Sequence, residues 1–170
     1  MKIKFHFTYL LMAFSFVICG YFINLIIFTF IILFHELGHF IMAKINNFDV
    51  KSVTIYPYGG LIHLNIKKNS LIRRELIVAC GGILFQIILM IIIRLLYMLG
   101  IIRLYVYNIF TMYNSSILFF NMLPITSLDG SKILCLLFYY ILPYKYVLKL
   151  ELYISMLIVS ILFFINLYRV

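Results

Sequence analysis

An almost unbroken apolar stretch from Phe5 to Ala43 is the feature that most limits how this chain can fold. It is too long for one crossing of a lipid bilayer, which takes about 20 residues, and it breaks near Gly20. Across the 170 residues, 66% are apolar and only 11% are charged, against about 25% charged in a typical soluble domain. So few charges cannot cover a soluble protein, and a disordered chain needs the opposite composition. The sequence therefore predicts a chain whose main solvent is lipid.

The apolar segments and their breaks predict six membrane helices in one domain covering residues 1–170. The helices are expected at about 5–19, 22–45, 75–99, 104–122, 129–142 and 146–168. Residues 50–66 differ because apolar and polar side chains alternate there, which is typical of strands. We expect a short β-hairpin or re-entrant strand pair in that segment, turning at Pro57–Gly60. The predicted fold class is an all-α polytopic membrane protein with a small hairpin between its second and third helices.

The N-terminus indicates no cleaved signal peptide, and the cysteines indicate no metal or redox motif. Lys2 and Lys4 before an apolar run imitate a signal peptide, but the run is too long and no small-residue cleavage site follows, so we expect a retained first helix. The three cysteines, Cys19, Cys80 and Cys135, form no C-x-x-C pair, and we interpret them as apolar packing residues.

The basic residues indicate orientation in a membrane rather than a nucleic-acid partner. The net charge is +9, but the basic side chains interrupt apolar runs. One side of the six-helix arrangement would carry Lys2, Lys4, Lys44, Lys51, Lys67, Lys68, Arg73 and Arg74. The other side would carry Arg103, Lys145 and Lys149. The positive-inside rule then places both termini and the hairpin on the cytoplasmic side of the membrane.

His35, Glu36 and His39 form the pattern H-E-x-x-H inside the second expected helix. Residues four apart lie on one face of a helix, so the two imidazoles can bind the same Zn²⁺ ion. Glu36 can act as the general base on the attacking water and afterwards protonate the leaving amine. A charge buried in a membrane costs about 2.5–3.5 kcal/mol even on the lenient insertion scale. A metal site accounts for that cost, and a polar contact between helices is the alternative.

A catalytic zinc ion needs a third protein ligand. Asp129 is the candidate because it lies between two apolar segments, and its alternative role is to cap the helix that begins near it. His63 is the rival ligand, although its isolated place in a strand beside a basic loop favours a surface position. His6, close to the N-terminus, is expected at the membrane interface.

Two motifs together resemble the site-2 protease family of intramembrane zinc metalloproteases. The first is His35-Glu36-Leu37-Gly38-His39 in a membrane helix, and the second is Asn121-x-x-Pro124-x-x-x-Leu128-Asp129-Gly130. The resemblance extends over nearly the whole chain. The segments Tyr56-Pro57-Tyr58-Gly59-Gly60 and Tyr113-Asn114-x-Ser116-Ile117-Leu118-Phe119 are also similar to those of a sporulation branch of the family.

The resemblance implies a complete set of site residues. Asp129 would be the third ligand of one Zn²⁺ ion, with His35 and His39, and Glu36 would be the catalytic acid and base. Asn121 would lie near the site and bind the substrate or the transition state. Gly59, Gly60 and Pro124 are further candidates for substrate contacts, and the edge of the hairpin would hold the substrate extended.

The resemblance also implies a partner and a location. The expected activity is regulated proteolysis of a protein with a membrane-associated pro-segment or transmembrane helix. In the sporulation branch the substrate is pro-sigma-K, the inactive precursor of a mother-cell sigma factor, which implies the mother-cell membrane around the forespore. Another membrane-tethered regulator, such as an anti-sigma factor, is the alternative substrate. Membrane inhibitor proteins are candidate partners besides the bilayer itself.

Three further expectations concern departures and alternatives. The sporulation branch typically carries a C-terminal nucleotide-sensing CBS domain, and we expect that regulation to be absent or supplied by another chain. Gly82 stands where the family often has proline, which leaves the local bend of the third helix open. Outside the protease class, a metal transporter would use the histidines without needing Glu36, and a non-catalytic scaffold would need none of these residues.

Overall fold

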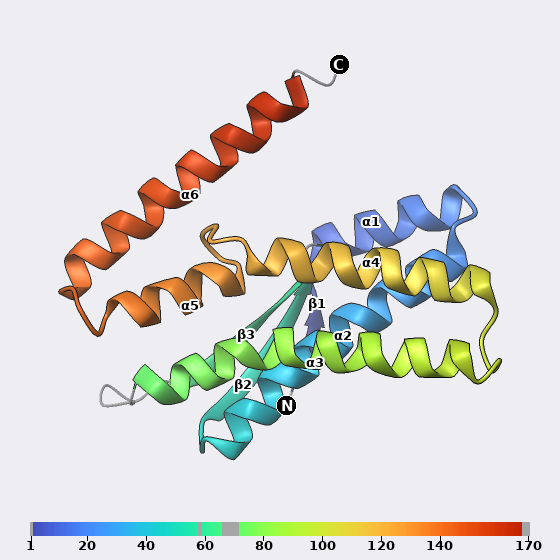
Figure 1. Ribbon diagram of the computed structural model, residues 1–170, viewed down its shortest axis with the longest axis horizontal. Helices are drawn as coiled ribbons and strands as arrows, with labels where there is room; N and C mark the ends of the chain where they lie inside the picture. Colours follow the sequence, from blue (N-terminus) through green and yellow to red (C-terminus); the bar gives the residue numbers. More distant parts are fainter. Residues whose placement is uncertain (1, 58, 66–71, 168–170) are drawn as a thin grey trace.

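The computed structural model describes residues 2–57, 59–65 and 72–167 (Figure 1). The elements in chain order are β1 (Lys2–Phe5), α1 (Phe7–Ile18), α2 (Phe22–Ile45), β2 (Asp49–Tyr56), β3 (Gly59–Asn65), α3 (Ile72–Met98), α4 (Leu104–Met122), α5 (Asp129–Phe138) and α6 (Tyr144–Leu167). The six helices confirm the predicted fold class. Helix α5 ends four residues before the expected boundary at residue 142, and the chain continues through turns to Pro143.

The six helices are not six complete membrane spans. Within the described residues, three helical segments are long and apolar enough to cross a bilayer: Phe22–Ile45, Ile72–Met98 and Tyr144–Ile165. Helices α1 and α5 have 12 and 10 residues. At 1.5 Å per residue they measure about 18 and 15 Å, against about 30 Å of hydrocarbon. The structure thus supports a membrane protein with helices of unequal length, and the predicted count of six spans is not confirmed.

The predicted hairpin is part of a larger sheet. Strands β2 and β3 pair antiparallel, as expected, and β1 adds to β2 in parallel to give the order β1-β2-β3. Tyr56 pairs with Gly59, and Ile55 with Gly60. Both glycines therefore belong to β3, and the predicted turn over Pro57–Gly60 was too wide. The analysis of the sequence missed β1 because four residues directly before an apolar run carry too short an alternation to distinguish a strand.

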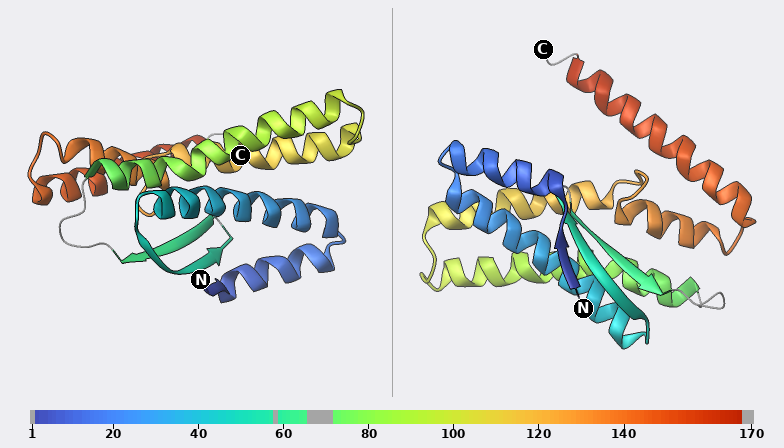
Figure 2. Two further views of the ribbon diagram at one scale, coloured as in Figure 1. Left: turned by 90° about the horizontal axis from the view of Figure 1, so that it is seen from below. Right: turned by 180° about the vertical axis from the view of Figure 1, so that it is seen from behind.

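Helix α2 lies in the middle of the molecule. Figure 2 shows α3 and α4 on one side of it and the sheet with α1 on the other. Ile27, Ile31 and Ile32 of α2 pack in one buried apolar cluster with side chains of α1, β2, α3 and α4. Helix α6 follows α5 and extends away from the other helices (Figure 1). The central position of α2 explains why charged and polar side chains in its second half are buried.

Helices α2 and α3 approach each other most closely at two glycines. A Cβ atom built on Gly38 would lie 2.4 Å from the carbonyl oxygen of Gly81, and one built on Gly81 would lie 2.8 Å from that of Gly38. Neither position has room for a side chain, so the two backbones are in direct contact. This contact brings the backbone of α3 against the face of α2 that carries His35 and His39.

Candidate active site

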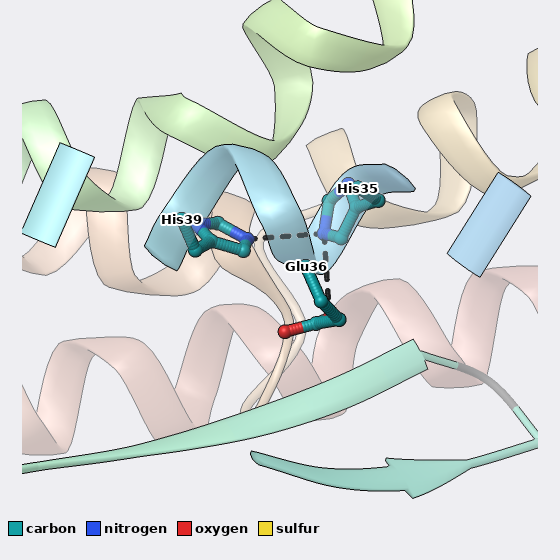
Figure 3. A group of neighbouring side chains, drawn as sticks. All are labelled: His35, Glu36 and His39. Carbon is teal, nitrogen blue, oxygen red and sulfur yellow. Dashed lines mark hydrogen bonds and ion pairs between the residues drawn. The ribbon is translucent and has the colours of Figure 1, made fainter. Parts of the chain in front are cut away.

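The two histidines of the H-E-x-x-H pattern share one buried face of α2. His35 and His39 are 2% and 6% exposed, and their Nε2 atoms are 3.0 Å apart (Figure 3). Opposite them lies Gly82 of α3. A Cβ atom there would be 2.4 Å from both Cε1 of His35 and Nε2 of His39. Glycine at position 82 therefore leaves the space that the two rings occupy, and α3 continues as a helix through it.

Asp129 is the first residue of α5, and its side chain points into the histidine pair. Its Oδ2 atom lies 3.0 Å from Nε2 of His35 and 2.9 Å from Nε2 of His39. Its Oδ1 atom accepts a hydrogen bond from Nζ of Lys132 at 3.1 Å. The N-cap residue of α5 is Leu128, so the alternative role of Asp129 as a helix cap is not what the structure shows. The structure instead brings together the three side chains predicted as metal ligands.

The hydrogen-bond partners of the two Nδ1 atoms determine which ring nitrogen of each imidazole has the lone pair. Nδ1 of His35 is 3.1 Å from Oε1 of Gln86, and Nδ1 of His39 is 2.8 Å from the carbonyl oxygen of Val78. A carbonyl oxygen only accepts, so each Nδ1 carries a proton, and in a neutral imidazole the lone pair is then on Nε2. The amide of Gly82 is also near Nδ1 of His39, but at 3.3 Å it is farther than the carbonyl oxygen of Val78 at 2.8 Å. We therefore assign the proton of His39 from the shorter contact.

With both imidazoles neutral, three lone pairs converge without a proton to share. They belong to Nε2 of His35, Nε2 of His39 and Oδ2 of Asp129, within 3.0 Å of one another. Such an arrangement is repulsive unless a cation lies between the atoms. Nitrogen and carboxylate ligands suit Zn²⁺ at 2.0–2.2 Å, and neighbouring ligands in a tetrahedron are then about 3.3 Å apart. The donor set fits a zinc ion after shifts of a few tenths of an ångström.

Glu36 lies beside this triangle of lone pairs. Its Oε1 atom accepts a hydrogen bond from the amide of Gly60 at 2.8 Å and is 3.9 Å from Nε2 of His35 (Figure 3). Its buried Oε2 atom has no hydrogen-bond partner among the described residues. His35, Glu36 and His39 each place one possible ligand atom within 4.8 Å of the others, so by distance Glu36 could also hold a metal. Asp129 lies closer to both imidazoles than Glu36 does.

Two cavities open onto several of these side chains, and a third, about 350 Å³ and otherwise lined by apolar residues of α2 and β2, reaches Glu36 alone. The smaller one, about 90 Å³, is lined by His35, Glu36 and Asp129 together with residues of β3, α4 and the loop before α5. The larger one, about 770 Å³, extends from Glu36, His39 and Asp129 between β2, α3, α5 and α6. Four of the five acidic residues of the chain line the larger cavity: Glu36, Glu75, Asp129 and Glu151. The acidic groups of an otherwise basic chain are therefore gathered at this site.

Asn121 and Gly59 also line the smaller cavity. Asn121 is 5% exposed in the last turn of α4, and its buried Nδ2 atom has no hydrogen-bond partner among the described residues. Gly59 lines the same cavity with a backbone φ of +147°, a conformation that favours glycine. Pro124 lies in the loop between α4 and α5 and is not among the residues that line either cavity.

Of the other two histidines, His6 lies apart from this group. Nδ1 of His6 is 2.8 Å from Oγ1 of Thr8, and its ring contacts that of Tyr56 at 4.5 Å. His63 pairs through its backbone with Ser52 in the sheet, and its side chain lies outside the described residues.

Two polar residues that contact the ligand set were missing from the predicted site. Gln86 supplies the oxygen next to His35, and Lys132 neutralises the outer oxygen of Asp129. Each left a weak signal in the sequence. Gln86 is a lone carboxamide in the apolar run of α3, and Lys132 follows Asp129 by three residues, which places it on the same side of α5.

Comparison with known proteins supports the assignment of this site. Residues 23–103, which include His35, Glu36, His39 and Gly60 but not Asp129, match peptidase family M50, a family of zinc metalloproteases. The chain is 37% identical to stage IV sporulation protein FB of Bacillus subtilis (strain 168) over 126 residues. That alignment covers 74% of this chain and 44% of the relative, so the chain spans less than half the length of that protein.

A solved structure shows the same fold. The site-2 protease from Methanocaldococcus jannaschii superimposes with a TM-score of 0.77 and 23% sequence identity. The match covers 98% of this chain and 81% of that one. The solved structure shows the fold, while the matched segment and the sequence relative show that the chain carries a peptidase family M50 (site-2 protease) domain.

Proposed function

We propose that the chain is an intramembrane zinc metalloendopeptidase that performs regulated proteolysis of a membrane-associated protein. The observation that carries this proposal is the convergence of three lone pairs, from His35, His39 and Asp129, beside an unpartnered carboxylate oxygen of Glu36. The match of residues 23–103 to family M50 supports the same activity. A metal transporter would need the three ligands but would have no use for a carboxylate held next to them.

The ligand set would hold one Zn²⁺ ion through Nε2 of His35, Nε2 of His39 and Oδ2 of Asp129. The ammonium group of Lys132 occupies the other oxygen of Asp129, so this carboxylate offers a single oxygen to the metal. When bound, Zn²⁺ supplies Lewis-acid activation of a water molecule and of the scissile carbonyl group.

Glu36 and Asn121 would carry out the remaining chemistry. The amide of Gly60 holds Oε1 of Glu36, which leaves Oε2 free to accept a proton from the attacking water. The same carboxyl group then passes the proton to the leaving amine. Nδ2 of Asn121, a buried donor at the cavity, would donate a hydrogen bond to the substrate oxygen on which negative charge develops.

The sheet offers a place for the substrate. Strand β3 pairs with β2 on one edge, and within the described residues its other edge carries no strand. The amide of Gly60 on that outer edge points at Glu36. A substrate segment that adds to this edge would be extended and would pass beside Glu36, with its backbone carbonyl groups accessible to attack. Gly59 and Gly60 keep the edge free of side chains at this point. Pro124 would shape the loop that carries Asp129 to the site.

We propose a pro-sigma-K-like precursor as the substrate, in the mother-cell membrane around the forespore. The similarity to stage IV sporulation protein FB supports this choice. The proposed orientation has both termini in the cytoplasm. It is supported by Lys44 at the end of α2 and by Arg73 and Arg74 at the start of α3, the ends of two packed helices. Inhibitory membrane proteins are proposed as further partners.

Co-expression of the full chain with a pro-sigma-K-like precursor tests this proposal. We expect a faster-migrating sigma-factor band on a gel, which appears only when the chain is present and is lost when zinc is chelated. A membrane-tethered anti-sigma factor, expressed in parallel, serves as the alternative substrate. Cleavage of the anti-sigma factor alone would replace the proposed substrate but keep the protease. Cleavage of neither by zinc-loaded protein would contradict the proposed activity.

Replacing Gly60 by alanine should uncouple metal binding from catalysis. The new Cβ atom would lie 2.3 Å from Cδ of Glu36, so the carboxylate must move. A displacement of about 1 Å at a reacting group costs on the order of 10²-fold in rate. We expect that loss in the gel-shift assay with an unchanged zinc content. The control is Gly20→Ala, where nothing lies within 4 Å of the added methyl group; because alanine is strained at its φ of +76°, cleavage is compared per amount of folded protein and should persist. Equal cleavage by Gly60→Ala and the unmodified chain would contradict the proposed place of Glu36.

A further inference from the structure

Gln86 is a fully buried polar side chain in the middle of α3, with an exposed fraction of 0%. Its Oε1 atom faces Nδ1 of His35 at 3.1 Å, and its Nε2 atom has no hydrogen-bond partner among the described residues. Its backbone carbonyl group accepts a hydrogen bond from Nδ2 of Asn114 on α4 at 3.0 Å. Burial of a carboxamide without full hydrogen bonding is costly. Among the described residues, the hydrogen bond to His35 is the one that the side chain of Gln86 makes, and it therefore indicates what this buried carboxamide does.

That contact determines which nitrogen of His35 is available. With an acceptor at Nδ1, the ring proton is on Nδ1 and the lone pair on Nε2 faces His39 and Asp129. Without an acceptor, the proton can move to Nε2. Oδ2 of Asp129 and Nε2 of His39, both 3.0 Å away, are then its acceptors, and the charged carboxylate is the stronger one. That hydrogen bond would occupy the two atoms that are proposed to bind the metal.

The two histidines differ in how their orientation is maintained. Nδ1 of His39 is held by the backbone carbonyl group of Val78, which is present whatever side chain occupies position 78. Nδ1 of His35 depends on the side chain of Gln86. A single substitution at position 86 can therefore change the tautomer of His35, whereas no side-chain substitution at position 78 removes the acceptor that holds His39.

We propose that Gln86 is a positioning residue for the metal centre: it holds His35 as the Nδ1-protonated tautomer and thereby presents the Nε2 lone pair to the metal. The proposal rests on the proposed zinc function of this site. Gln86 itself contacts neither the metal nor the substrate. The hydrogen bond from Asn114 holds the backbone of α3 at Gln86 against α4, which keeps the carboxamide at the height of His35.

Measuring zinc affinity in Gln86 variants tests the proposal. Gln86→Met keeps an unbranched side chain of similar length but has no oxygen acceptor. Loss of such a partner typically weakens metal affinity by about 10–100-fold, and we expect this increase in Kd for Zn²⁺ by competition with a chelating dye. The visible absorption of the Co²⁺-loaded protein should change in shape and intensity as well. Gln86→Glu retains the acceptor oxygen and should restore both the affinity and the Co²⁺ spectrum.

The control separates positioning from packing. Asn24→Leu also removes a carboxamide that links two helices, since Nδ2 of Asn24 donates to the hydroxyl group of Tyr113 at 3.1 Å, but it lies away from the ligand set. Its Kd for Zn²⁺ should not change. The proposal is overturned if Gln86→Met keeps the original Kd and Co²⁺ spectrum, or if Asn24→Leu weakens binding equally. His35→Ala distinguishes failure of the positioning role of Gln86 from failure of the proposed zinc function. Zinc retained in that variant would contradict the proposed function itself.

Discussion

Replacing Glu36 by glutamine should reduce cleavage of a co-expressed precursor by about 10²–10⁴-fold, the usual contribution of general acid–base catalysis. The amide keeps the size of the side chain and an oxygen that can accept the hydrogen bond from Gly60. It cannot accept a proton from water at the position of Oε2. Because Glu36 stands outside the three converging lone pairs, the variant should retain zinc. The measurements are a gel-shift time course and the zinc content of the purified protein.

Asp49→Asn is the matched control for this result. It makes the same carboxylate-to-amide change at an exposed position at the start of β2, outside the residues that line the three cavities beside Glu36, and cleavage should be unaffected. Unimpaired cleavage by Glu36→Gln would show that another group is the base. Loss of zinc from that variant would identify Glu36 as a ligand. Zinc transport that persists without any cleavage would favour the transporter interpretation.

Replacing Asp129 by alanine should abolish both zinc binding and cleavage. The substitution removes the only carboxylate oxygen within 3.0 Å of both Nε2 atoms among the described residues. Zinc bound by a complete set of ligands is stabilised by about 10–16 kcal/mol, so losing one of three should raise the Kd by roughly 10³-fold. The measurement is zinc retained after dialysis against a chelator, with the gel-shift assay alongside.

His6→Asn is the control for the loss of a potential ligand elsewhere in the chain. The imidazole of His6 contacts Thr8 and Tyr56 rather than the ligand set, and asparagine can still cap α1, so the zinc content should not change. Zinc retained by Asp129→Ala would contradict the assignment of the third ligand. In that case His63→Ala and Glu36→Ala would be compared, because these residues are the remaining candidates.

The parts of the site that were predictable from the sequence are those that depend on local periodicity. His35 and His39 are four residues apart in an apolar helix, so their shared face follows from 3.6 residues per turn. The apolar runs predicted the six helices, and the alternation over 50–66 predicted the pairing of β2 with β3. Strand β1 and the early end of α5 were missed because short segments beside long apolar runs carry too little pattern of their own.

The sequence alone determined that this chain belongs in a membrane and that one of its helices presents two imidazoles on a single face. Only the tertiary structure decided what those imidazoles meet. Asp129 lies 90 residues from His39, and it reaches the pair because α5 begins against the end of α4. Gln86 and Gly60 reach His35 and Glu36 from α3 and β3 in the same way. Such contacts arise from the packing of distant elements around α2, which no local repeat encodes.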